Sequence, residues 1–393
     1  MKKVKKLMSM VLVLLLLASV LSACSQETAA PPAASTAASE AAPAGTAPDA
    51  TAAGGAIGME NVKVGVVMNT SKEDGGWSQA HYQSFMQVKK DLGLTDDQMV
   101  IMEEIPDTGS DCENAIEMLI DDGCNMIFGT SSGLSAAIYA CASRHPDVFF
   151  HQFEGNTLDN CAAYTIRDYE AIFMCGYAAA KMSTVDELGF MAAQPQSSVV
   201  RAINAWAAGA QYANPNATVK VVWANSWYDP TVEKEGANSM LDSGIQSLGY
   251  HGSTTSVMQA AAEHDGYATG FHIDMKDYAP TAVLTSFMWN WAPIYSEFIQ
   301  NVADGKWTNA TLFKGMESGC ASIAPFNADI MSDEIIADCE DVQKKVISGE
   351  VSVFAGPITD NKGNEVLADG AEFTDEEWIG MMYLAENVIG DLP

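Results

Sequence analysis

Two tryptophans in this chain stand where a planar ligand could be bound. Trp77 follows the loop 69–76, which ends in a glycine pair, and Trp227 holds the corresponding place in the loop 225–230. Each loop follows an expected strand and precedes an expected helix, so the two indole rings are predicted to face each other. Stacking on an aromatic ring contributes about 0.5–1.5 kcal/mol beyond the stabilisation that comes from burying apolar area. Indole faces also stack on sugars, so the pair predicts a ligand sandwich without choosing between a heterocycle and a pyranose.

Polar side chains follow the later expected strands. Asp274 comes after an apolar run, and its carboxylate can accept two N–H hydrogens of a ligand or cap a turn. Asn290 lies between Trp289 and Trp291 and offers both a donor and an acceptor, so it suits ligand contact and hinge packing equally. The other predicted ligand residues, also near strand ends, are Asn69, Ser131, His251 and Trp289.

The common catalytic motifs are missing from the sequence. It contains no GxSxG, no HExxH, no phosphate-binding loop and no GxGxxG after a strand. Its six histidines lack metal-ligand spacing, and no cysteine pair has CxxC spacing. An enzyme would also need a positioned acid or base. We therefore predict a binding protein without a catalytic residue, a metal or a cofactor.

Short apolar runs alternate with stretches of helical period from residue 62 onward. The runs that indicate buried strands are 62–68, 100–105, 126–129 and 148–152. The helical stretches between them are 76–92, 110–122 and 131–144. Ser110 and Glu113 have the spacing of a capping box. Repeated strand–helix–strand units predict an α/β fold with a doubly wound parallel sheet.

A second series of the same kind follows. Helices are expected at 168–182, 197–212 and 231–243, and strands at 188–192 and 219–223. Strands at 267–272 and 282–287 and a helix at 292–304 then fit a chain that crosses back to the first lobe. The last expected elements are a hairpin at 351–366 and an amphipathic helix at 374–389. Ligands of such sheets sit beyond the carboxyl ends of the strands, so two facing lobes predict one shared cleft.

The start of the chain has the features of an export signal. Four lysines precede the apolar run 7–21, which is shorter than the roughly 20 residues of a membrane-spanning helix. The run ends in Leu-Ser-Ala before Cys24, which predicts cleavage and lipidation of Cys24, although an ordinary signal peptide with a chance cysteine is the alternative. Residues 25–55 are almost entirely Ala, Pro, Ser, Thr and Gly, a composition typical of a flexible tether. We expect a lipid-anchored protein on the extracytoplasmic face of the cell membrane.

Length and composition limit the organisation further. The chain of 393 residues is longer than one hydrophobic core usually supports. The expected parts are a signal peptide at 1–23, a lipidated cysteine and tether at 24–57, a first lobe at 58–166 plus 289–323, and a second lobe at 167–288 plus 324–393. The net charge of −31 argues against binding to nucleic acid. Seven cysteines remain besides Cys24, and we expect them to be buried thiols in a monomer, with a disulfide framework as the alternative.

Several segments together resemble the basic membrane protein family of solute-binding lipoproteins, which includes purine nucleoside receptors of ABC importers. The resemblance covers essentially all of the chain after the tether. The segments that carry it are KVGVV at 63–67, GWSQAH at 76–81, AINA at 202–205, NSWYDP at 225–230, WNWAP at 289–293 and FAGPI at 354–358.

The resemblance implies a type I periplasmic-binding-protein fold that closes on its solute and delivers it to an ABC permease. In the nucleoside-binding members, phenylalanines at the places of Trp77 and Trp227 clamp the base, and an aspartate matching Asp274 holds its edge. Those members also have a lysine that helps to hold the ribose, where this chain has Trp289 and Asn290. This departure favours a free purine base over a nucleoside. A signalling lipoprotein that senses the ligand and a sugar receptor on the same fold are the alternatives.

Overall fold

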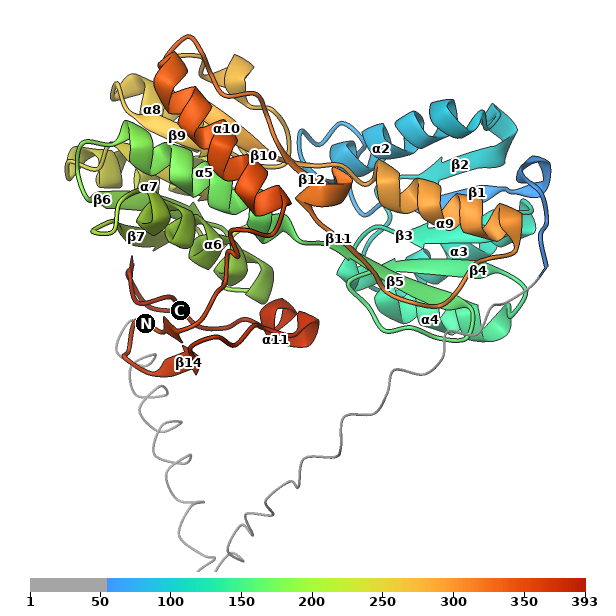
Figure 1. The fold of residues 1–393 in the computed structure, drawn as a ribbon. Coiled ribbons are helices and arrows are strands. Elements are labelled where there is room, and N and C mark those ends of the chain that lie inside the picture. Colours follow the sequence, from blue (N-terminus) through green and yellow to red (C-terminus); the bar gives the residue numbers. More distant parts are fainter. Residues whose placement is uncertain (1–54) are drawn as a thin grey trace, which may run out of the picture. The chain divides into compact units, whose positions relative to one another are not determined.

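The computed structural model describes residues 55–393 and places two large β-sheets there, each covered by helices, and a separate two-stranded sheet (Figure 1). Cys24, the predicted signal peptide and all but the last residues of the predicted tether lie outside the described residues. No helix in the described part of the chain is both long enough and apolar enough to cross a bilayer.

The first sheet has six strands, all parallel, in the order β11-β5-β4-β3-β1-β2. Its strands are β1 (Val64–Val67), β2 (Met99–Met102), β3 (Met126–Gly129), β4 (Phe149–Phe153), β5 (Cys161–Ile166) and β11 (Leu312–Lys314). Its helices are α2 (Trp77–Leu92), α3 (Ser110–Asp121), α4 (Ser135–Arg144) and α9 (Ala292–Asp304). Neighbouring residues of β3 point to opposite faces: Ile127 packs with α3 and α4, whereas Phe128 contacts Phe85 of α2 at 5.4 Å between ring centroids. Helices on both faces explain why the inner strands β1 and β3 carry no polar side chain.

The second sheet has seven strands in the order β12-β10-β9-β8-β6-β7-β15, and among them β12 alone runs antiparallel to its neighbour. Its strands are β6 (Glu187–Ala192), β7 (Thr218–Trp223), β8 (Ser247–His251), β9 (Tyr267–Gly270), β10 (Val283–Trp289), β12 (Ala321–Ile323) and β15 (Val388–Ile389). Its longer helices are α5 (Asp168–Met182), α6 (Ser197–Ala213), α7 (Pro230–Asp242), α8 (Ser256–Glu263) and α10 (Asp333–Ile347). The repeated parallel units agree with the predicted α/β class.

Within residues 55–393 the chain passes between the two sheets three times: after β5, after β10 and between β11 and β12. The strand β12 pairs with β10 in the second sheet, although it lies inside the segment 289–323 that we assigned to the first lobe. The limits of the two lobes remain a prediction.

The C-terminal segment differs most from expectation. The predicted helix 374–389 is wrong, because α11 spans only Asp375–Ile379 and the chain then continues extended into β15. Met381 and Leu384 are buried, so the apolar spacing does mark a buried face. The backbone of residues 383–385, however, is hydrogen-bonded to the side chain of Asn204 on α6. The Asn204 amide nitrogen donates to the carbonyl of Tyr383, and its oxygen accepts from the amide of Ala385.

Smaller elements also differ. The capping box is wrong, because Ser110 is the first residue of α3 and the preceding Gly109 caps it without a side chain. The predicted hairpin 351–366 occupies fewer residues than expected. Its strands are β13 (Ile358–Thr359) and β14 (Glu365–Leu367), and Gly363 lies in the turn between them. The strands β5, β11 and β12 and the helices α8 and α10 were not predicted, and β8 was expected only as a possible strand before His251. All seven cysteines of the described part of the chain are free and buried, as expected.

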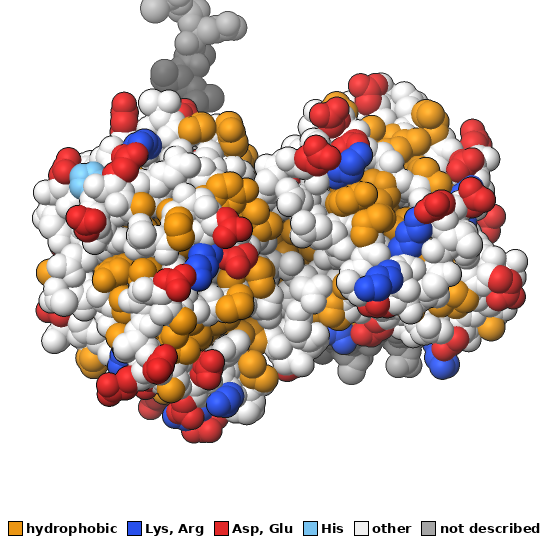
Figure 2. Space-filling model, turned by 90° about the horizontal axis from the view of Figure 1, so that it is seen from above, with side chains coloured by type: hydrophobic (Ala, Val, Ile, Leu, Met, Phe, Trp, Pro, Cys, Tyr) orange, Lys and Arg blue, Asp and Glu red, His pale blue; other side chains and the backbone are white. Residues whose placement is uncertain are grey.

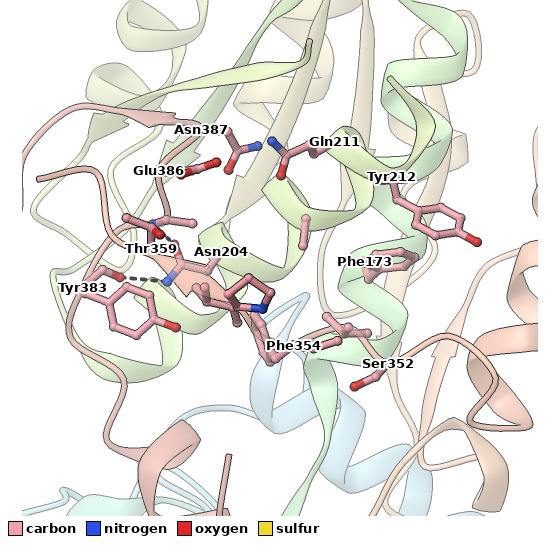
Figure 3. Close-up of a pocket in the computed structure, with 16 residues that line it drawn as sticks. Phe173, Asn204, Gln211, Tyr212, Ser352, Phe354, Thr359, Tyr383, Glu386 and Asn387 are labelled. Atoms are coloured by element: carbon pink, nitrogen blue, oxygen red, sulfur yellow. Dashed lines mark hydrogen bonds between the residues drawn. The ribbon is translucent and has the colours of Figure 1, made fainter. Parts of the chain in front are cut away.

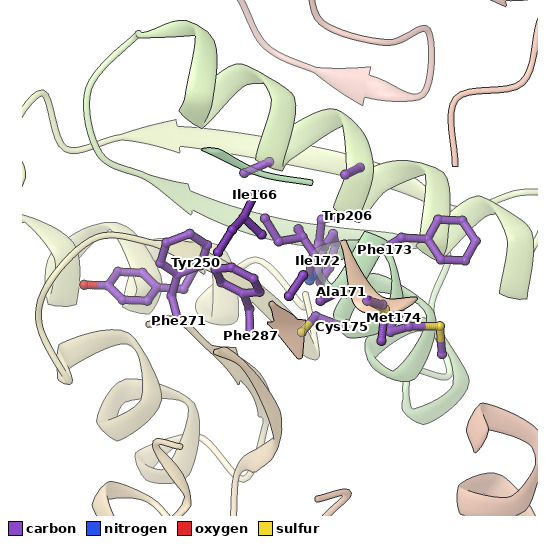
Figure 4. Close-up of a cluster of buried hydrophobic side chains, with 14 of the residues drawn as sticks. Ile166, Ala171, Ile172, Phe173, Met174, Cys175, Trp206, Tyr250, Phe271 and Phe287 are labelled. Carbon is purple, nitrogen blue, oxygen red and sulfur yellow. The ribbon is translucent and has the colours of Figure 1, made fainter. Parts of the chain in front are cut away.

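Helices α5 and α6 touch through their backbones. A Cβ at Gly176 of α5 would overlap the carbonyl oxygen of Trp206, and a Cβ at Gly209 of α6 would overlap that of Phe173. This close approach buries Trp206 among side chains of α5 and the sheet, where its indole N–H donates to Thr269 at 3.1 Å (Figure 4). The core of the second lobe therefore depends on two glycines inside helices.

We expect Gly176→Ala to destabilise the protein, although alanine favours a helix by about 1 kcal/mol over glycine. The backbone of α6 cannot move aside as a side chain would, so overpacking should cost roughly 1–3 kcal/mol. The measurement is the urea midpoint of unfolding. Gly236→Ala in α7 is the matched control, because the atoms nearest its Cβ belong to the side chains of Met191 and Val222 rather than to a backbone. An equal or higher midpoint for Gly176→Ala would contradict this account.

Candidate functional site

Three tryptophans gather where elements of both sheets meet. Trp289, the last residue of β10, stacks on the buried Trp291 at 5.1 Å with an angle of 15° between the rings. Trp77, the first residue of α2, stands nearly perpendicular to both, at 5.4 Å from Trp289 and 5.6 Å from Trp291. The Trp77 indole N–H donates to the carbonyl of Thr130 at 3.0 Å. The ring of Trp77 is therefore half-buried and fixed in orientation.

His272 joins this cluster from the second lobe. Its Nδ1 accepts a hydrogen bond from the indole N–H of Trp289 at 2.8 Å, and its ring lies 6.4 Å from that of Trp77. A Cβ at Gly76 would come within 3.2 Å of the His272 ring, so the glycine permits the close approach. Gly76 thus makes room for a histidine that we did not predict as a site residue.

Trp227 lies further away, 41% exposed, and contacts His251 at 6.0 Å between ring centroids. His251, the last residue of β8, lies 6.3 Å from His272. Among the described residues no ring contact joins Trp77 to Trp227, and the two histidines stand between them. Burial lowers the pKa of His251 well below its ordinary value. The facing of the two tryptophans across a ligand remains a prediction.

Asp274 and Asn290 have local partners in the structure. The exposed carboxylate of Asp274 accepts from the amide of Lys276 at 3.0 Å, so it caps a turn. The Asn290 amide donates to the carbonyl of Gly319 at 3.0 Å, and its oxygen accepts from the amide of Ala292 at 3.2 Å. Asn290 therefore links two of the passages between the sheets, as hinge packing requires.

Oxygen acceptors from three strand ends of the first sheet are buried without a hydrogen-bond partner in the described part of the chain. They are Oδ1 of Asn69, Oδ1 of Asp107 and Oε1 of Gln152. The amide of Asn69 donates to Asp107 at 3.1 Å, and that of Gln152 donates to the carbonyl of Ser131 at 2.8 Å. A buried acceptor without a donor costs about 1–3 kcal/mol. Each of these atoms would be stabilised by an N–H or O–H donor.

Arg201 is a buried residue that sequence reasoning missed. It lies in the first turns of α6, is 2% exposed, and donates from Nε and Nη2 to the Asp168 carboxylate at 2.9 and 3.2 Å. Its Nη2 also lies 3.7 Å from Oε1 of Glu154, which follows β4 of the first sheet. Burial raises the pKa of Glu154 above its ordinary value. The only signal in the sequence was a lone charge inside the apolar helix 197–212.

Two cavities in the described part of the chain do not coincide with these residues. One of about 460 Å³ lies between α5, α6 and the C-terminal segment, where Figure 3 shows Gln211, Phe354 and Tyr383 along its wall. None of the predicted ligand residues lines it. Acidic side chains are scattered among apolar ones on the face drawn in Figure 2. Among residues 55–393 no cluster of three His, Cys, Asp or Glu side chains could hold a metal ion.

Comparison with known proteins places these features in one group. Residues 61–356 match the family model described as ABC transporter substrate-binding protein PnrA-like. A purine-binding protein of Brucella abortus is 33% identical over 341 residues, which cover 86% of this chain and 96% of the relative. A protein of Haloferax volcanii named as an ABC transporter glucose-binding protein is 28% identical and covers 81% of each chain.

A solved structure has the same fold. An ABC transporter solute-binding protein of Conexibacter woesei superimposes with a TM-score of 0.63 at 20% identity, covering 74% of this chain and 98% of the other. This likeness supports the predicted type I periplasmic-binding-protein fold.

We expect the contribution of His272 to stability to depend on pH. Burial lowers its pKa from 6.5 to about 4 in the folded protein, while the unfolded chain protonates near the ordinary value. Between these values the unfolded state binds more protons. The contribution is therefore complete above pH 6.5 and is lost on acidification toward pH 4, by up to about 1.4 kcal/mol per pH unit.

The difference in unfolding free energy between the wild type and His272→Gln, from urea denaturation at pH 7.5, 6 and 5, should shrink toward low pH. Glutamine keeps an acceptor for the Trp289 indole, and His264→Gln on the surface controls for the loss of an imidazole. A difference that stays constant across this range would refute the prediction.

Proposed function

Because the chain belongs to the PnrA-like family of ABC transporter substrate-binding proteins, we propose that it captures a purine at the strand ends of its two lobes and delivers it to the permease of an ABC importer. The family and the fold are those of solute-binding proteins, so no bond need be made or broken. The observation that carries the proposal is the contact of Trp77 with His272, which brings an aromatic wall of the first lobe to the second. The purine-binding relative supports the ligand class.

We favour a free purine base over a nucleoside. Trp289 and Asn290 replace the lysine that the nucleoside-binding members use, and both have partners inside the protein. The acceptors on Asn69, Asp107 and Gln152 suit a ligand rich in N–H groups, such as adenine, which has two exocyclic N–H hydrogens and one on the ring. Ribose hydroxyls would also satisfy these acceptors, so ligand measurements must separate the two.

Ligand binding would work by favouring a closed arrangement of the lobes. A ligand that contacts both Trp77 and Trp227 binds the closed form better than the open one, and this differential affinity is what shifts a conformational equilibrium. The closed form would then be the one that the permease recognises.

We further propose that a lipid on Cys24 holds the mature chain, as a monomer, on the extracytoplasmic face of the cell membrane. The support is the sequence pattern at 7–24 and the tether composition of 25–55. A single lipid chain binds membranes only weakly, whereas two chains give a stable anchor, which a diacylglycerol supplies.

The ligand class can be tested by a thermal-shift screen of the full chain after unfolding and refolding to remove any carried-over ligand. We expect adenine, hypoxanthine, guanine or xanthine to raise the melting temperature more than their ribosides do, because Trp289 and Asn290 stand where the nucleoside-binding members have the lysine that helps to hold the ribose. A larger shift with ribosides would restore the nucleoside assignment. A response to glucose alone would favour the sugar receptor that the Haloferax relative suggests.

The site can be tested by calorimetry with the best purine of that screen. Trp77→Ala and Trp227→Ala should each weaken binding by roughly 1–3 kcal/mol, the scale of base stacking on an aromatic ring. Asp274→Ala should cost a similar amount by leaving ligand N–H groups unpaired. Tyr212→Ala, an exposed aromatic on α6, is the control and should bind as the wild type does. Unchanged affinity in all three site variants would mean that the ligand binds elsewhere.

The anchor can be tested by cell fractionation. Cys24→Ala should move the protein from the membrane to the soluble extracytoplasmic fraction or leave its signal uncleaved, because the lipid has no attachment atom. Ser25→Ala, at the next position, should stay with the membrane. Equal membrane retention of Cys24→Ala and the wild type, with the signal removed in both, would rule out lipidation at this residue.

A further inference from the structure

The C-terminal segment 357–393 lies beyond the family match, which ends at residue 356. It contains β13, β14, α11 and β15, and it ends at the outer edge of the second sheet, where Val388 of β15 pairs with Val219 of β7. Helix α11 packs against α6. The segment is therefore anchored on the second lobe, outside the part of the chain that the family model matches.

Trp378 of α11 connects this segment to both sheets. It is 3% exposed, and its ring lies 4.4 Å from that of Phe313, which belongs to β11 of the first sheet. The ring also contacts Tyr169 at the start of α5, at 5.0 Å with an angle of 77°. The guanidinium carbon of Arg201 lies 4.8 Å from the ring centroid. One side chain thus contacts an edge strand of the first sheet and two helices of the second lobe.

These partners sit at two passages of the chain between the sheets. Arg167, in the passage after β5, donates to the carbonyl of Phe313 at 3.1 Å and forms an ion pair with Glu317 in the passage after β11, at 2.6 Å. Arg201 bridges Asp168, at the start of α5, and Glu154, after β4. The Trp378 ring lies over the guanidinium of Arg201 and therefore packs against one face of these ion pairs.

We propose that Trp378 is a positioning residue for ligand binding: it fixes Arg201 and Phe313 against each other and so sets the angle between the lobes. The inference rests on the proposed function. Trp378 has no contact with Trp77, Trp227 or Asp274 among the interactions of the described residues, and its effect passes through the hinge. Aromatic pairs and cation–π contacts of this kind have preferred geometries, so they resist the displacement of one partner.

Removing the indole should therefore widen the range of lobe angles in the free protein. The fraction of molecules in the binding-competent arrangement falls, and the apparent dissociation constant rises in inverse proportion to that fraction. We expect Trp378→Ala to raise the Kd for adenine about tenfold. Trp378→Phe keeps a ring over Arg201 and should remain within about twofold of the wild type.

The experiment uses the full chain in detergent and three variants: Trp378→Ala, Trp378→Phe and the matched control Phe373→Ala. Phe373 belongs to the same segment but has ring contacts only with Phe354 and Tyr383, away from the first sheet. Calorimetry with adenine and with hypoxanthine gives the Kd. Amide hydrogen exchange without ligand reports on β11 and on residues 167–169, and small-angle X-ray scattering reports on the lobe angle.

Support requires faster exchange at β11 and a larger radius of gyration in Trp378→Ala than in Phe373→Ala, with the rise in Kd rescued by Trp378→Phe. Exchange and scattering unchanged in Trp378→Ala would overturn the inference, and so would equal effects of Phe373→Ala, which would indicate general destabilisation. If the wild type binds neither adenine nor hypoxanthine, the proposed ligand fails, while the measurements without ligand still decide the role of Trp378.

Discussion

The buried guanidinium of Arg201 needs carboxylates beside it, and these carboxylates come from segments of both lobes. Arg201 is 2% exposed, and its charge is met by Asp168 and Glu154. Removing one partner from a buried ion pair leaves an uncompensated charge that costs about 3–5 kcal/mol. Because Glu154 follows a strand of the first sheet while Arg201 lies on a helix of the second lobe, the same charge balance that stabilises the fold also ties the two lobes together.

The site at the strand ends follows a different rule. Parallel strands bring their carboxyl ends to one edge, where ligands of such sheets bind. Near this edge Asn69, Asp107 and Gln152 have buried acceptors without partners, while the tryptophans and histidines supply aromatic walls. Under the proposed function, a site of this composition would select a flat, hydrogen-bonding molecule by shape and by donor pattern together.

The sequence predicted the strand–helix units of both lobes well, because buried parallel strands and amphipathic helices have clear periods. Helices α5 and α9 begin and end at the predicted residues. The prediction from sequence failed where tertiary contacts, rather than the local spacing of apolar residues, determine the secondary structure. The apolar spacing of 381–388 suits a helix, but Asn204 takes the backbone bonds that a helix would need.

The same distinction applies to the site. Strand-end position sufficed to select Trp77 and His251, whereas His272 was recognisable only once Gly76 was seen beside it. Arg201 and Trp378 come from segments far apart in the sequence, and their contact depends on the path of the C-terminal segment. No local pattern in a single sequence encodes such a pairing.

The order of strands along the chain also determines when each sheet can receive its last strand. The first sheet receives its edge strand β11 only at residues 312–314, and the second sheet receives β15 only at 388–389. When the chain is made from its amino terminus, the first sheet therefore lacks its edge strand until residue 314, and the second lacks its own until residue 389. Contacts of such long sequence separation form slowly. The second sheet can thus be completed only after the first.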